Sequence, residues 1–169
     1  MTEFVEHEEQ KTRPALLLVL AILSFISIGV GILSNTFGLI SGPLSEEDIK
    51  VQRVEMAKQK SQLRGQGMSG MVSFVEKLEG MIEETNNNFY LSKGILFLTD
   101  FIGLFGVIFM LRRRKLGFHM YIVYSLLALG GMYLYVSPEN IHMSLPIFNL
   151  IISGLFIFLY SRTLHWMRN

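Results

Sequence analysis

The chain contains no cysteine in its 169 residues, and it has only four prolines and one tryptophan. The absence of cysteine excludes disulfides, thiolate zinc sites and thiol catalysis. No glycine-rich loop in a strand–helix context is available to hold a phosphate, because Gly65-Gln66-Gly67 lacks that context. No pair of histidines has the spacing of a metal site, since the four are scattered as His7, His119, His142 and His165. We therefore expect no enzyme, no cofactor and no metal.

An excess of charge of one sign is also lacking, because 15 Lys and Arg stand against 14 Asp and Glu. Without a dominant basic face, nucleic acid is not an expected partner. The first ten residues are acidic where a signal peptide would be basic. The apolar block that follows Pro14 exceeds the hydrophobic region of a signal and lacks a small-x-small cleavage site. We interpret it as a retained membrane anchor.

Long hydrophobic runs are what the chain has in abundance. Half of its residues are hydrophobic and the mean hydropathy is +0.40. These residues are concentrated in blocks too long for the core helices of a soluble protein. We predict one all-α membrane domain over residues 1–169, a four-helix bundle preceded by a short cytoplasmic tail at 1–13. The predicted spans cover about 14–40, 90–111, 116–136 and 143–164, and Trp166 in the tail that follows is expected at the membrane interface.

The charged stretch between the first two spans predicts an extramembrane amphipathic helical hairpin over about 45–85. Ser45, followed three residues later by Asp48, is a helix start signal, and Gly65-Gln66-Gly67 interrupts the helix. The second helix carries an apolar stripe formed by Met71, Val75, Leu78 and Ile82. The hairpin can lie on the membrane surface, cap the bundle or offer this stripe to another membrane protein; the first two are favoured.

The orientation follows from the short loops. The cluster Arg112-Arg113-Arg114-Lys115 occupies a very short connection, where positive charge is most decisive. The opposite loop, 137–142, has no lysine or arginine. We therefore predict a multi-pass protein of the cytoplasmic (inner) membrane with both termini and the 112–115 loop in the cytoplasm. The cations of the hairpin favour the reverse orientation, but they are interspersed with acids and lie far from the spans.

Asp100 is the one carboxylate in the apolar stretch 91–111, where a charge costs roughly 2.5–3.5 kcal/mol on insertion scales. Counting about 1.5 Å per residue from the cytoplasmic ends places Ser24 and Ser153 at nearly the same depth, with Ser125 close to it. These four residues are the candidate polar site. Lys93 leans away from Asp100, so we expect the acid to be neutral or exposed to water. It either pins helix packing through hydrogen bonds, which we favour, or relays a proton or ion.

Small residues mark surfaces where helices approach closely. In the first span they recur every three or four residues, as Ser24, Ser27, Gly31, Ser34 and Gly38. In the second span, Gly103 and Gly106 have the same effect. Asn35 and Asn149 both fall toward the outer side, where we expect interhelical hydrogen bonds and a possible contact between the two.

The start of the first span resembles that of small uncharacterised four-span proteins in the inner membrane of Bacteroidota-type bacteria. The resemblance rests on Arg13–Leu17, Leu23–Ile26 and Gly29–Asn35. It implies an inner-membrane location and no particular activity. Small multidrug transporters also have four spans, but they carry their essential acid in the first span and have no long hairpin.

Two functions are compatible with these features of the sequence. The first is a non-enzymatic accessory or scaffold subunit of a membrane complex, with the lipid bilayer and another membrane protein as partners. The alternative is a small proton-coupled transporter or channel that uses Asp100. An enzyme acting on lipid ranks last, because no nucleophile or metal constellation is present.

Overall fold

The computed structural model describes residues 14–167, in which all of the regular secondary structure is helical. The prediction of an all-α chain is therefore confirmed. Four helical segments are long and apolar enough to cross a membrane, which indicates a multi-pass membrane protein. The tail predicted at 1–13 lies outside the described residues. The four segments are α1 (Ala15–Ser41), α4 (Phe89–Leu111), α5 (Leu116–Gly130) with the 3₁₀ turn η1 (Gly131–Leu134), and α6 (Ser144–Ser161) with η3 (Leu164–Trp166).

Between α1 and α4 lie two further helices, α2 (Glu46–Gly65) and α3 (Ser69–Asn87). α1 ends at Ser41 because Gly42 takes a φ of 78°, a left-handed conformation that continues no helix. The predicted cap of α2 is confirmed: Ser45 Oγ accepts from the backbone N–H of Asp48, and Asp48 Oδ2 accepts from the backbone N–H of Ser45. A second left-handed glycine, Gly67, turns the chain into α3.

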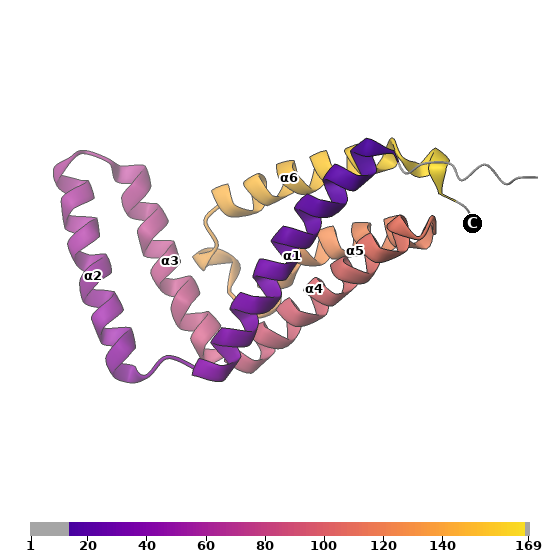
Figure 1. Cartoon of the computed structure of the whole chain (residues 1–169). Coiled ribbons are helices and arrows are strands. Elements are labelled where there is room, and N and C mark those ends of the chain that lie inside the picture. Colours follow the sequence, from indigo (N-terminus) through magenta and orange to yellow (C-terminus); the bar gives the residue numbers. More distant parts are fainter. Residues whose placement is uncertain (1–13, 168–169) are drawn as a thin grey trace, which may run out of the picture.

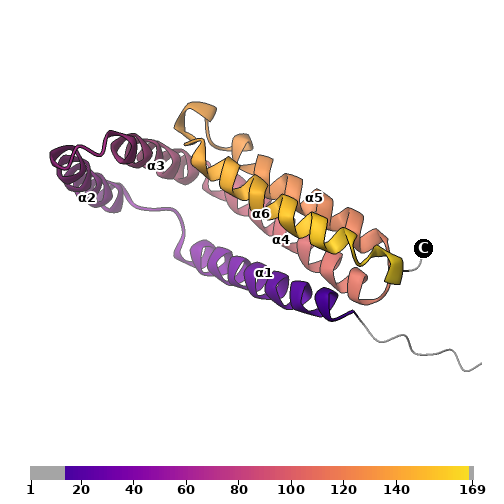
Figure 2. The same ribbon diagram turned by 90° about the horizontal axis from the view of Figure 1, so that it is seen from above.

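The four apolar helices run alongside one another (Figures 1 and 2). α4 lies at the centre of this arrangement and contacts both α1 and α5, while α6 packs on α5 and α1. α2 and α3 leave the end where α1 finishes and α4 begins, and they run across the long axis of the other helices (Figure 1). We call α2 and α3 the arm, and this end of the molecule the arm end.

α4 and α5 approach so closely that their backbones touch. A Cβ added at Gly117 would lie 2.4 Å from the backbone N of Met110 and 2.5 Å from the carbonyl O of Gly106. A Cβ at Gly103 would lie 2.6 Å from the ring of Tyr124. Glycine is therefore required on both helices, because any side chain at Gly117 would push them apart.

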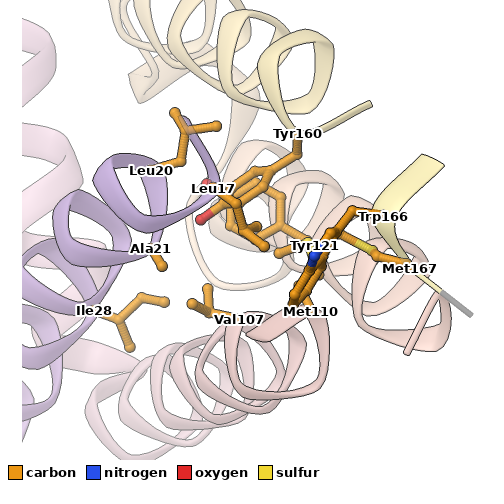
Figure 3. Close-up of a cluster of buried hydrophobic side chains, with 10 residues drawn as sticks. All are labelled: Leu17, Leu20, Ala21, Ile28, Val107, Met110, Tyr121, Tyr160, Trp166 and Met167. Carbon is orange, nitrogen blue, oxygen red and sulfur yellow. The ribbon is translucent and has the colours of Figure 1, made fainter. Parts of the chain in front are cut away.

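The buried apolar core lies away from the arm, near the loop that joins α4 to α5. It draws side chains from α1, α4, α5, α6 and η3 (Figure 3). Leu17, Val107, Met110 and Tyr160 are fully buried there. Trp166, which we expected at the membrane interface, is 7% exposed and belongs to this core. It is buried because η3 turns the chain back under the α4–α5 loop.

The two helices of the arm are joined by a ladder of ion pairs. Arg53–Glu83, Lys60–Glu79 and Arg64–Glu76 have N–O distances of 2.6, 2.7 and 3.0 Å. Each pair is partly exposed, so its stabilising effect is at most about 1 kcal/mol. The shared spacing of cations on α2 and anions on α3 nevertheless fixes the register of the two helices. Val72 and Val75 of α3 are buried, whereas α2 buries no residue.

Candidate functional site

Asp100 joins α4 to α1. Its carboxylate Oδ2 accepts a hydrogen bond from Asn35 Nδ2 at 3.0 Å, and Asn35 is 8% exposed. The carboxylate lies directly over Gly31, where an added Cβ would be 3.0 Å from Oδ2. Gly31 therefore leaves room for the Asp100 carboxylate on the surface of α1, and Asn35, one turn further along α1, donates a hydrogen bond to it.

Ser24 does not lie beside Asp100 as the depth count predicted, because α1 and α4 are in a different register. Asp100 faces Gly31, and a Cβ added at Gly38 would lie 2.5 Å from Lys93 Nζ. Ser24 is seven residues before Gly31, which is about 10 Å along a helix. Counting from the helix ends assumed that α1 and α4 begin at one depth. Because α1 packs on α4 through Gly31 and Gly38, the two helices are shifted along each other and do not begin at one depth.

Ser24 belongs to a second polar cluster with two tyrosines. Its Oγ lies 3.0 Å from the hydroxyl of Tyr160 and 3.5 Å from that of Tyr121. The rings of the two tyrosines are 4.7 Å apart and point into the core between α1, α5 and α6 (Figure 3). All three residues are buried, so each hydroxyl depends on the others for its hydrogen bonds.

The two remaining candidate serines make no described hydrogen bond with Asp100. Ser125 is buried, and its Oγ has no hydrogen-bond partner. Ser153 Oγ donates to Asn149 Oδ1 at 3.3 Å, and Asn149 donates in turn to the carbonyl of Ala128 at 2.9 Å. The interhelical hydrogen bonds expected of Asn35 and Asn149 are formed, but with Asp100 and Ala128 and not with each other.

Asp100 takes part in none of the ion pairs found within residues 14–167, all three of which join α2 to α3. Lys93 turns its ammonium toward the ring of Phe89, with Nζ 5.7 Å from the ring centroid. An acid held by one amide and no cation can act as a hydrogen-bond acceptor in packing. When protonated it can also donate.

A set of polar contacts that sequence reasoning did not predict fixes the arm to the bundle. The Glu84 carboxylate of α3 accepts from the backbone N–H of Ser137 and from Asn140 Nδ2, the latter at 3.0 Å. Asn88 Nδ2 donates to the carbonyl of Tyr135 at 3.0 Å. Glu84, Asn88, Tyr135 and Ser137 line a polar pocket between the end of α3 and the 133–138 segment. The pKa of Glu84 is held below its usual value by hydrogen bonds from Ser137, of which the bond from the backbone N–H has the largest effect.

Asn86 completes this attachment from the other side. Its Oδ1 accepts from the backbone N–H of Leu44 at 2.6 Å, and its Nδ2 donates to the carbonyl of the same residue at 3.2 Å. We call Glu84, Asn86, Asn88 and Asn140 the collar. The run Asn86-Asn87-Asn88 and the turn at Ser137-Pro138 are visible in the sequence. Their pairing spans about fifty residues and has no local signal.

An open groove lies beside the start of α6, and Met71 is the residue of the predicted apolar stripe that lines it. Phe74 packs edge-on against His142, with ring centroids 5.2 Å apart. Met68 and Met71 are 48% and 52% exposed at the rim. We call this the arm groove; it is lined by Met68, Gly70, Met71, Phe74, His142 and Ser144.

The four predicted topology determinants form the turn between α4 and α5, at the end opposite the arm. Arg113 takes a left-handed φ of 65°, and its guanidinium lies 4.7 Å from the ring centroid of Trp166. Arg112 and Arg114 are exposed. This contact ties the loop to the C-terminal turn, and we call this end of the molecule the basic end.

Within residues 14–167, no group of three or more His, Asp and Glu side chains is arranged to hold a metal ion. No protein-family model matches the chain, and no curated protein or solved structure matches it either.

Proposed function

We propose that the chain is a non-enzymatic subunit of the cytoplasmic membrane, an accessory or scaffold protein whose arm binds another membrane protein. The apolar helices direct large side chains outward: Ile26, Val30, Phe37 and Phe148 are 60%, 61%, 66% and 68% exposed. Surfaces of this extent are unfavourable in water and are satisfied by lipid tails. The four-helix bundle is then the membrane domain, and the arm lies outside it.

The observation that carries this proposal is the construction of the arm. Its helices are held together by the ion-pair ladder, and the collar joins the end of α3 to the segment before α2 and to the 135–140 segment. The arm groove nevertheless leaves two methionines exposed. Met side chains adapt to varied partner shapes, which suits a protein interface. A fixed arm with an open apolar groove is suited to holding a partner and offers no chemistry of its own.

Substitutions in the groove test this proposal. Affinity purification of the full-length chain from native membranes under mild extraction should recover one partner in near-stoichiometric amount. Met68→Glu/Met71→Glu should remove that partner, since two charges would be desolvated in the interface. The matched control is Val51→Glu/Val54→Glu, which changes two residues of α2 that are 55% and 56% exposed. A lone chain, or a partner retained by the groove variant and lost from the control, would contradict the proposal.

The alternative is a small proton-coupled transporter or channel that uses Asp100. It is supported by the half-buried carboxylate between α1 and α4, which has one amide partner and no cation among the described ion pairs. Flux measurements on Asp100 variants separate the two functions.

A further inference from the structure

The charges of the molecule are distributed unequally between its two ends. Among residues 14–167, every Asp and Glu apart from Asp100 lies between Glu46 and Glu84 or at Glu139, in the arm or the turn beside it. The basic end carries Arg112, Arg113, Arg114, Lys115 and Arg162, and none of the described acids. Three cations of the arm are paired with glutamates, whereas Arg112, Arg114 and Arg162 take part in none of the ion pairs described within residues 14–167.

A contact of Arg113 joins the two segments that carry the cations of the basic end. Arg113 lies over Trp166, so the α4–α5 loop and the C-terminal turn that follows Arg162 form one surface. Arg113 and Lys115 make contacts of their own. Arg112 and Arg114 are exposed on the first of these segments, and Arg162 is exposed at the start of the second.

The position of Arg114 indicates the depth of this surface. Its guanidinium Cζ lies 5.9 Å from the ring centroid of Phe109, within the last turn of α4. The charge is therefore held beside the end of an apolar helix and does not extend away from it. In a bilayer, this is the level at which lipid phosphates lie, and guanidinium groups bind phosphate through paired hydrogen bonds.

We propose that the basic end is a binding site for the headgroups of anionic phospholipids, with Arg112, Arg114 and Arg162 as the phosphate-binding residues. This inference rests on the proposed membrane location. A zwitterionic lipid presents no net charge to such a surface. Each cation near an anionic membrane surface strengthens binding about fivefold. The site therefore selects phosphatidylglycerol over phosphatidylcholine.

Native mass spectrometry of the full-length chain in a neutral detergent tests the site. Phosphatidylglycerol should bind on the order of tenfold more tightly than phosphatidylcholine, and the preference should fall as salt is raised. Arg112→Gln/Arg114→Gln should abolish most of the preference. Lys50→Gln/Lys58→Gln removes the same charge from the exposed face of α2 and should retain it. Circular dichroism without lipid establishes that both variants are folded.

Several results would overturn the inference. Equal binding of the two lipids by the wild-type chain would exclude a selective site, and a preference that survives Arg112→Gln/Arg114→Gln would place it elsewhere. Inorganic phosphate that displaces phosphatidylglycerol at millimolar concentration would identify free phosphate as the ligand. In each case a chain that still requires detergent leaves the membrane proposal intact. A chain that is monodisperse without detergent would contradict both the lipid-binding site and the membrane location.

Discussion

Asp100 shows how a single polar residue can connect two apolar helices. The acid fits over Gly31, and its one amide partner comes from the helix that it faces. A carboxylate satisfied in this way links α1 to α4. The hydroxyl cluster of Ser24, Tyr121 and Tyr160 links α1 to α5 and α6 nearer the basic end.

We expect Asp100→Ala to lower the free energy of unfolding by about 1 kcal/mol, the usual value of an interhelical hydrogen bond in a membrane protein. Asp100→Asn should leave it nearly unchanged, because the new amide oxygen can still accept from Asn35. Denaturant titration in detergent measures both. Proteoliposomes made with the same variants address transport. A proton-coupled flux that Asp100→Asn abolishes in a folded chain would replace the scaffold function with the alternative.

The lowered pKa of Glu84 predicts that the stability of the chain depends on pH through the collar. Its pKa is lowered in the folded chain by the N–H and hydroxyl of Ser137 and by Asn140. A lowered carboxyl pKa contributes stability above the unfolded pKa of about 4.3 and loses it as pH falls through the folded value. The wild-type chain should therefore be more stable than Glu84→Gln at pH 7, and the two should converge at acid pH. Thermal melting in detergent across this range measures the difference.

Glu55→Gln provides the control for this experiment, because Glu55 is an exposed acid of α2 outside the three ion pairs. Its melting temperature should follow that of the wild-type chain at every pH. A Glu84→Gln variant that also follows the wild-type curve would show that the collar does not depend on the carboxylate charge.

At the level of elements, local signals predicted helices and their ends, but they did not predict register. Gly42, Gly67 and the Ser45 cap act through their own backbone and nearest neighbours, so the sequence alone was enough to place the breaks. The partner of Asp100 depends on how α1 slides along α4, and that is decided by contacts at Gly31 and Gly38. A shift of about two turns places Gly31 opposite Asp100 in place of Ser24, and brings Asn35 within reach, without changing any local pattern. The hydrogen bonds of the collar were not predicted because they join segments that are far apart in the sequence.

At the level of the whole molecule, the polar attachments and the charge are separated along the bundle. The collar and the ion-paired arm occupy one end, and the buried core with the arginine loop occupies the other (Figure 1). Such a molecule is asymmetric in a bilayer. Because an arginine-rich short loop is retained on the cytoplasmic side, we expect the arm outside.

The absence of native cysteine makes this orientation directly testable, since a single introduced thiol is the only one in the chain. Gln59→Cys lies on the exposed face of α2, and Arg112→Cys replaces one of four adjacent cations and leaves three to direct insertion. A membrane-impermeant maleimide added to intact spheroplasts should label Gln59→Cys. It should label Arg112→Cys only after the membrane is opened with detergent. The reverse pattern would place the arm in the cytoplasm and the basic end outside, and a partner of the arm would then have to be sought among cytoplasmic proteins.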